Sequence, residues 1–185
     1  MKRFLKSLLT VVVAIIVFLI GFLWYAGFFE KVFITEKETG PYYALVAEVG
    51  FYEDPVNVRN RLFNALKAED IMGEKAVAIS EHPFRENLIT KTGWLVDNKD
   101  VQLAERINPD FEIIQIPQEK RIVADFPYNN SFSIMSGSYI VYRRLLQYAN
   151  QKNMETGKIY EVYDNTEDRI FYHLNIKKER LDTQQ

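Results

Sequence analysis

A run of 23 residues without a charged side chain, from Ser7 to Phe29, is the feature that most limits what this chain can be. Only Ser7, Thr10, Gly21 and Gly27 in the run fall outside the apolar residue types. As a helix the run would measure about 34 Å, enough to cross a hydrocarbon layer of about 30 Å. The run therefore predicts one membrane-spanning helix over residues 7–29.

Two other readings of this run are weaker. The apolar part of a cleaved signal peptide is about 7–15 residues long, which is shorter than this run. A cut after Ala26 would also put the bulky Trp24 where signal peptidases need a small residue. A core helix of a soluble domain is the second alternative, but this run has no polar face. We expect an uncleaved single-pass anchor whose partner is the lipid bilayer.

The charges on either side of the run predict how the chain is oriented. Lys2, Arg3 and Lys6 precede the run, and Glu30 and Lys31 follow it. Because cationic flanks stay on the cytoplasmic side, we expect a cytoplasmic N-terminus and an exported domain, on the periplasmic side of the inner membrane in a bacterium. The alternative is an endoplasmic reticulum membrane with a cytosolic domain. The predicted segments are a basic tail (1–6), the anchor (7–29), one domain (30–176) and a polar tail (177–185).

Composition excludes several classes of function. The 185 residues include 23 Lys+Arg and 25 Asp+Glu, a net charge of -2 that argues against a nucleic-acid partner. Without Cys there is no thiolate metal site or Cys nucleophile, and two His leave little material for a metal site. Nucleophile-elbow and phosphate-binding glycine motifs are absent as well. We predict no metal, no cofactor and no catalytic residues, and the sequence indicates no particular protein partner.

Two helices are predicted in the domain. Asp54 and Pro55 are typical of an N-cap and a first helical position, and apolar residues then recur at every fourth place (Val58, Leu62, Leu66). A second amphipathic helix is predicted from about Ile134 to Asn153. Gly137 and Ser138 near its start would let another backbone come close.

Six further stretches predict strands, over residues 42–50, 76–81, 111–116, 121–126, 159–163 and 170–176. The last two are joined by the turn-rich segment 164–168, which is typical of a hairpin. Both halves of the domain run strand, helix, strands, and segment 45–48 matches segment 122–125. The sequence thus predicts an α+β fold built from duplicated βαββ units with pseudo-two-fold symmetry and a cleft along the axis.

The second half also carries a recognisable set of strings, Phe126-Pro127-Tyr128 followed by Ser133-Ile134-Met135, then Ile159-Tyr160-Glu161-Val162-Tyr163 and Ile170-Phe171-Tyr172. Over residues 32–176 the chain resembles the gyrase-inhibitor-like (GyrI-like) small-molecule-binding domain, the effector fold of multidrug-sensing transcription activators. It is most similar to the branch that contains the membrane-anchored, testis-expressed reticulophagy receptor. Here an apolar run precedes the domain, in the place where the activators have a DNA-binding helix-turn-helix.

Glu161 is the residue most strongly indicated for function. It interrupts an apolar strand and, by the two-residue period of a strand, shares a face with Ile159 and Tyr163. If that face lines the cleft, burial raises the pKa of the carboxyl group, while a cationic ligand favours its charged form. The resemblance implies this role, because a Glu on the matching strand is the counter-ion for lipophilic cations in the multidrug sensors. The alternative is a Glu161 that points to solvent or pairs with an Arg.

Aromatic residues are candidate walls of the same pocket, each with the alternative of a plain core or surface position: Tyr43, Trp94, Phe126, Tyr139 and Tyr163. We expect a membrane-anchored domain that binds an amphipathic small molecule, cationic or not, without transforming it. One alternative is a protein-interaction module related to the receptor. Another is a hydrolase of strained electrophilic compounds, in which Glu161 orients water and Tyr163 donates a proton. His82 and His173 are expected to be structural or exposed.

Overall fold

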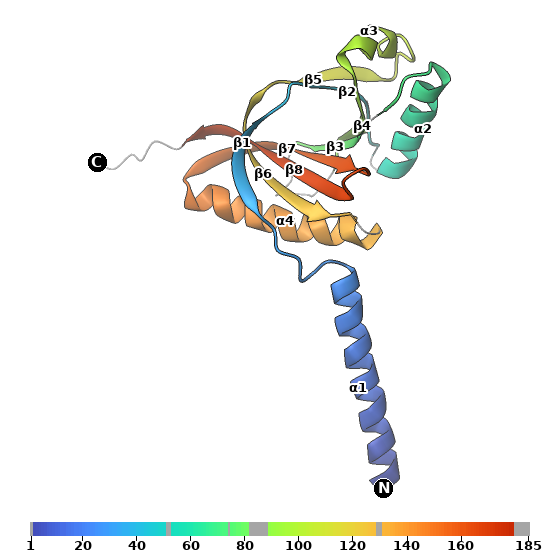
Figure 1. Ribbon diagram of the computed structural model, residues 1–185, viewed down its shortest axis with the longest axis vertical. Helices are drawn as coiled ribbons and strands as arrows, with labels where there is room; N and C mark the ends of the chain where they lie inside the picture. The colour runs from blue at the N-terminus through green and yellow to red at the C-terminus, as the bar shows by residue number, and fades with distance from the viewer. Residues whose placement is uncertain (1, 51–52, 74, 82–88, 129–130, 180–185) are drawn as a thin grey trace, which may run out of the picture.

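The computed structural model describes residues 2–50, 53–73, 75–81, 89–128 and 131–179. A long helix stands apart from an α+β domain whose curled sheet carries helices (Figure 1). In chain order the elements are α1 (Lys2–Tyr25), β1 (Ile34–Thr39), β2 (Tyr42–Glu48), α2 (Pro55–Ala68), β3 (Ala76–Ser80), β4 (Lys91–Val96), the 3₁₀ turn η1 (Asn98–Asp100), α3 (Val101–Ala104), β5 (Glu112–Ile116), β6 (Glu119–Pro127), α4 (Ser131–Gln151), β7 (Met154–Asp164) and β8 (Arg169–Glu179).

The first helix, α1, is long and apolar enough to cross a membrane. Its segment Leu8–Tyr25 has a mean hydropathy of 2.8, and none of it is buried against the rest of the described chain. The helix ends four residues before the predicted limit at Phe29, because Gly27 adopts a left-handed backbone conformation with φ of 80°. The amide of Phe28 then returns to the carbonyl of Leu23 at 3.0 Å, an ending typical of helices capped by glycine.

The two predicted domain helices are confirmed as α2 and α4. Asp54 caps α2 by accepting a hydrogen bond from the Val56 amide at 2.9 Å, and the apolar side predicted from the four-residue spacing is buried. The second helix, α4, begins at Ser131, three residues earlier than predicted, and ends at Gln151.

All six predicted strands form, but two other strands were missed. The sequence of β1, Ile34–Thr39, is mostly polar because it is an edge strand that pairs only with β6. In β4, Gly93 interrupts the apolar pattern by which a strand is recognised. A glycine is needed there because a Cβ would lie 1.9 Å from the Leu45 carbonyl oxygen of the neighbouring strand. Strand β8 continues to Glu179, so the predicted polar tail from residue 177 begins inside a strand. Residues 180–185 of that tail, and His82, lie outside the described residues.

The eight strands form one antiparallel sheet in the order β1-β6-β8-β7-β3-β4-β2-β5. The segment β2-α2-β3-β4 and the segment β6-α4-β7-β8 therefore contribute three adjacent strands each, and they meet at the β3–β7 pair. The hairpin predicted at 164–168 joins β7 to β8.

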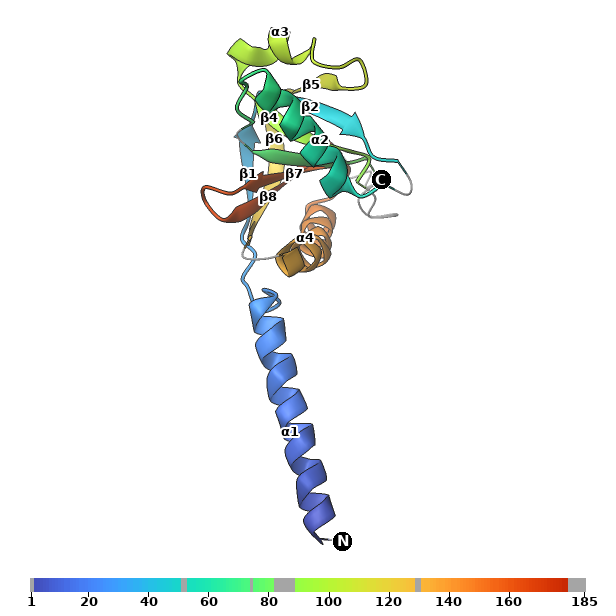
Figure 2. The same cartoon turned by 90° about the vertical axis from the view of Figure 1, so that its right-hand side faces the viewer.

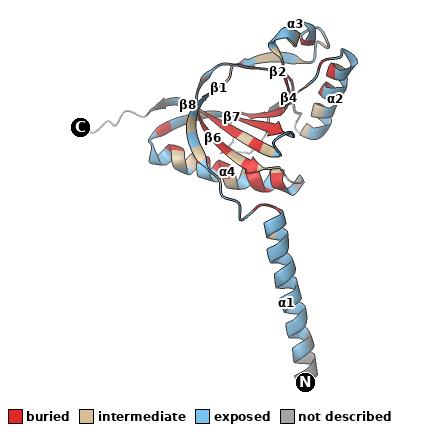
Figure 3. Cartoon of the chain, viewed as in Figure 1, coloured by how far each residue is buried: buried red, intermediate tan, exposed pale blue. Residues whose placement is uncertain are grey.

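Both long domain helices pack on the same face of this sheet (Figure 2). Under α4 lies one apolar cluster, which includes Tyr142, Leu145, Ile159 and Tyr163. A second apolar cluster joins α2 to β2 and β4. Trp94 packs against this cluster and also against the cluster under α4. Buried residues concentrate on the central strands and on the side of α4 that faces them (Figure 3). The site described below belongs to this helix-covered face.

The opposite face of the sheet encloses a third apolar cluster and two buried basic side chains. Arg121 is fully buried and donates hydrogen bonds to the Thr39 carbonyl at 2.6 Å, to the Pro117 carbonyl at 2.8 Å and to Asn175 Oδ1 at 2.7 Å. It thereby ties the β1–β2 turn to the β5–β6 turn. His173 is also buried, and its Nδ1 atom has no hydrogen-bond partner among the described residues.

Candidate functional site

The Glu161 side chain is buried in the middle of the sheet. In strand β7, Glu161 pairs with Ala78 of β3 on one side and with Tyr172 of β8 on the other. As predicted from the two-residue period, it shares a face with Ile159 and Tyr163. Helix α4 covers that face, and only 3% of the residue is exposed. The alternative of a solvent-facing carboxylate is therefore excluded.

Three hydroxyl groups hold the carboxylate. Tyr142 donates to Oε1 at 2.5 Å, Ser138 lies 3.3 Å from the same oxygen, and Tyr163 donates to Oε2. Ser138 and Tyr142 are four residues apart on α4, so the helix turns both side chains towards the sheet. Each carboxylate oxygen thus has a hydroxyl partner, supplied from two different elements.

Among the residues that the structure describes, no side chain of opposite charge forms an ion pair with Glu161. Burial raises the pKa of its carboxyl group, although the hydrogen bonds from Tyr142, Tyr163 and Ser138 and the more distant charge of Arg59 oppose that rise. Burial, together with the Glu161 charge, also raises the pKa values of Tyr142 and Tyr163. The tyrosines therefore remain proton donors.

Aromatic rings extend the site towards α2. The Tyr128 and Tyr163 rings meet edge to face at 5.9 Å, and the Arg59 guanidinium lies 5.0 Å from the centre of the Tyr163 ring. Trp94 holds Arg59 in place, since its indole N–H donates to the Arg59 carbonyl at 2.9 Å. A cation therefore already occupies one face of Tyr163, which is a favourable arrangement for an aromatic ring.

Close packing of α4 on the sheet depends on Gly137. A Cβ at this position would lie 2.6 Å from the Tyr172 hydroxyl and 2.9 Å from the Phe126 ring. The Tyr172 hydroxyl is buried without a hydrogen-bond partner among the described residues, and its ring meets that of Tyr142 at 5.9 Å. The absence of a side chain at residue 137 thus allows Ser138 and Tyr142 to reach Glu161.

The predicted site residues do not all lie together. Tyr163 contacts Glu161 directly, and Phe126 is fully buried in the same cluster, with Trp94 packed at its edge. Tyr43 is half-buried in the cluster between α2 and β2. Tyr139 is 56% exposed on the outer side of α4, because one helical step turns it away from its neighbour Ser138.

Several residues at the site were missed in the sequence. Tyr142 and Ser138 are the carboxylate's partners, Tyr172 and Tyr128 complete the aromatic surroundings, and Arg59 reaches the site from α2. The spacing of Ser138 and Tyr142 was the signal available, since residues four apart share a helix face.

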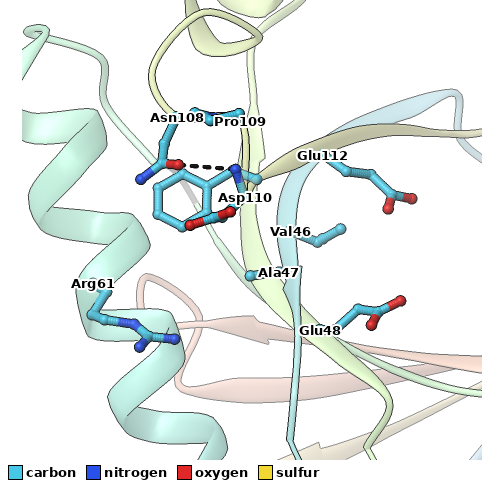
Figure 4. A pocket seen from close by; sticks show the side chains of 9 residues that line it. Val46, Ala47, Glu48, Arg61, Asn108, Pro109, Asp110 and Glu112 are labelled. Carbon is cyan, nitrogen blue, oxygen red and sulfur yellow. Dashed lines mark hydrogen bonds between the residues drawn. The ribbon is translucent and has the colours of Figure 1, made fainter.

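A separate hollow of about 450 Å³ lies between α2, strand β2 and the start of β5 (Figure 4). It is lined by Val46, Ala47, Glu48, Arg61, Asn108, Pro109, Asp110, Phe111 and Glu112. None of the predicted site residues lines it. Within the described ranges, no group of three or more His, Asp or Glu residues is placed to hold a metal ion.

Comparison with known proteins shows a shared fold. No family model and no curated protein matches the sequence. The solved structure of SAV2435 bound to tetraphenylphosphonium superposes with a TM-score of 0.52 at 10% identity, covering 78% of this chain and 94% of that one. An integron cassette protein from the mobile metagenome of Vibrio cholerae (TM-score 0.44, 9% identity, 80% and 100% covered) also matches. So does a putative transcription regulation protein from Staphylococcus aureus MU50 (0.44, 9%, 78% and 99%). The chain thus has the fold of SAV2435.

Proposed function

We propose that this protein is a membrane-anchored, GyrI-like domain that binds an amphipathic cation at Glu161 without transforming it. The observation that carries the proposal is a buried carboxylate whose partners in the described structure are hydroxyl groups. An ionised carboxylate that lacks a cationic partner is costly to bury, so the free protein favours the protonated form. A bound cation supplies the missing charge and favours the ionised form.

Each neighbour of Glu161 has a role in this proposal. Tyr142, Ser138 and Tyr163 fix the orientation of the carboxylate through their hydroxyl groups. Trp94, Phe126 and Tyr163 offer aromatic surface, and cation–π contact with such rings contributes about 0.5–2 kcal/mol. Tyr43, on the α2 side of the same sheet face, would contact only a ligand that extends towards β2. Tyr139 is not assigned to this site, because it points outward.

The sheet order and the comparison support the assignment to this fold family. The segments β2-α2-β3-β4 and β6-α4-β7-β8 occupy equivalent places on either side of the β3–β7 pair, and the outer strands β5 and β1 pair with β2 and β6 in the same way. This arrangement is what a duplicated βαββ unit would produce. The likeness to SAV2435, whose structure contains a lipophilic cation, supports a cation as ligand. The reticulophagy-receptor branch remains a hypothesis that rests on the sequence strings.

Membrane anchoring is the second part of the proposal. The exposed apolar surface of α1 and its length support insertion in a bilayer over residues 7–29. The cationic flank before α1 favours a cytoplasmic N-terminus with the domain exported, and a cytosolic domain on the endoplasmic reticulum is the alternative.

A hydrolase is a second candidate, favoured by the direct hydrogen bond from Tyr163 to Glu161. In that case Glu161 would orient water and Tyr163 would donate the proton. Turnover of a strained electrophile that is lost in Glu161→Gln would support hydrolysis over simple binding.

Titration with tetraphenylphosphonium tests the binding proposal. The full chain is placed in phosphatidylcholine nanodiscs, and uptake by empty nanodiscs is subtracted. We expect saturable binding that weakens at least about tenfold, or 1.4 kcal/mol, in Glu161→Gln. The matched control is Glu155→Gln, an exposed carboxylate on the same strand, which should bind like the wild type. Non-saturable uptake, or equal affinity in Glu161→Gln, would refute the counter-ion role.

A further inference from the structure

The outer face of α4 carries an exposed apolar stripe at its N-terminal end. Phe132, Met135 and Tyr139 are spaced by three and four residues, so they share one side of the helix. Their exposed fractions are 46%, 67% and 56%. The inner side of α4 packs on the sheet, so this stripe looks away from the domain core.

The stripe lies beside the C-terminal end of α1. The rings of Phe22 and Phe132 meet edge to face with centres 5.2 Å apart. Ser136 donates a hydrogen bond to the Ala26 carbonyl, and Gly27 lies against the Phe126 ring. Figures 1 and 2 both show α4 running across the end of α1, as the part of the domain nearest to it. The outer face of α4 is therefore turned towards the side from which α1 extends.

The length of α1 indicates how deep in a bilayer the apolar stripe of α4 would lie. The 18 residues of Leu8–Tyr25 form the apolar span, and at 1.5 Å per residue they extend about 27 Å, close to the thickness of a hydrocarbon layer. Phe22 precedes the end of that span by about 4.5 Å along the helix axis. Since Phe132 contacts Phe22, it lies at the boundary between acyl chains and headgroups. Apolar residues at the same end of α1 are exposed too, namely Trp24, Tyr25, Phe28 and Phe29.

Cationic side chains follow the apolar stripe along α4. Arg143 donates to the Tyr139 hydroxyl at 3.1 Å, and its guanidinium lies 5.5 Å from the centre of that ring. A shallow hollow of about 630 Å³ continues the face, lined by Arg143, Leu146, Gln147, Asn150 and Gln151. Arg143 forms no ion pair with another described residue. An apolar side flanked by Arg is the pattern of a helix that lies on an anionic lipid surface.

We propose that α4 lies on the bilayer, with Phe132, Met135 and Tyr139 in the headgroup region and Arg143 against anionic phospholipid headgroups. This inference rests on the part of the proposed function in which α1 spans the membrane. It deepens that function, because Ser138 and Tyr142 on the inner side of α4 contact Glu161. The binding site is then separated from the lipid by one helix, a thickness of about 10 Å.

Site-directed nitroxide labelling tests the contact, since the chain contains no Cys and each introduced Cys is unique. The full chain is labelled at Met135→Cys, at Leu103→Cys on α3 as an exposed apolar control remote from α1, and at Val17→Cys within α1. Each label is measured in bilayers of phosphatidylcholine with and without phosphatidylglycerol. Accessibility to oxygen, which concentrates in lipid, is compared with accessibility to a water-soluble nickel chelate.

We expect the oxygen-to-nickel accessibility ratio at residue 135 to be several-fold higher than at residue 103, and to rise with phosphatidylglycerol. Changing Arg143 to Gln should reduce the rise. A lipid-exposed label at 17 combined with a water-exposed label at 135 would overturn this inference and leave the anchor intact. A label at 135 shielded from both reagents would indicate a protein covering and would also overturn it. A water-exposed label at 17 would refute the anchor, and the contact with it.

Discussion

Protonation of buried His173 should destabilise this protein in mild acid, by an amount that follows from its surroundings. Burial and the charges of Arg121 and Lys37 lower the pKa of His173 from 6.5 to about 4. The unfolded chain therefore binds a proton at this residue between those two pH values, whereas the folded protein does not. Because the folded pKa is depressed, stability is complete above pH 6.5 and is lost as the pH falls.

The size of the loss can be calculated from the two pKa values. Their difference corresponds to about 3 kcal/mol in full, of which most would be lost between pH 7.5 and pH 4.5. His173→Phe keeps a ring against Tyr42, which contacts His173 edge to face at 6.2 Å, but removes the titrating group. Carboxyl groups elsewhere in the protein also titrate in acid and destabilise both proteins alike. The quantity to compare is therefore the difference in free energy of unfolding between the wild type and His173→Phe, measured at each pH.

Urea unfolding of the full chain in detergent micelles, followed by tryptophan fluorescence, measures that difference. The free energy of unfolding of the wild type should fall by about 2–3 kcal/mol more than that of His173→Phe between pH 7.5 and 4.5. Parallel pH profiles for the two proteins would show that the buried imidazole does not control acid stability, and the reasoning would be refuted.

Three further predictions concern the Glu161 site. Because burial raises the pKa of Glu161, wild-type stability should decline as the pH rises from 4.5 towards the folded pKa, and Glu161→Gln should lose this decline in urea unfolding. Arg59→Gln removes a like charge from the face of Tyr163 and should tighten tetraphenylphosphonium binding about tenfold; unchanged or weaker binding would contradict a cation site there. Gly137→Ala places a Cβ 2.6 Å from the Tyr172 hydroxyl and should cost about 1–3 kcal/mol. Gly157→Ala, with no contact under 3.4 Å, is the control for that cost.

Much of the fold was predictable because its signals are local. Asp54 and Pro55 start α2 through their own backbone preferences, and the apolar spacing after them fixes which side is buried. Glu161 could be identified because a carboxylate within an apolar strand is unusual in itself. The edge strand β1 was missed because polar residues follow Ile34 without any alternation of apolar and polar side chains. Strand β4 was missed because Gly93 interrupts its apolar pattern, and the close approach to Leu45 that requires this glycine involves a residue far away in the sequence.

The surroundings of Glu161 were less predictable because they depend on how α4 lies on the sheet. Tyr142 and Ser138 reach the carboxylate from a helix some 20 residues earlier in the chain. The adjacent Tyr139, which has the same side chain as Tyr142, points outward because the helical phase differs. The kinds of residue near the site could therefore be read from the sequence, whereas the direction in which each one points required the packed structure.

Proton release on ligand binding tests the central claim most directly. Calorimetric titration of the full chain in nanodiscs with tetraphenylphosphonium, repeated at several pH values in pairs of buffers that differ in ionisation enthalpy, gives the number of protons exchanged. If Glu161 is a buried acid that ionises to meet a cation, binding should release a proton at pH values below the raised pKa of the free protein, and affinity should strengthen as the pH rises towards that pKa. Glu161→Gln should release none. Binding without proton release in the wild type, or with equal release in Glu161→Gln, would contradict the account.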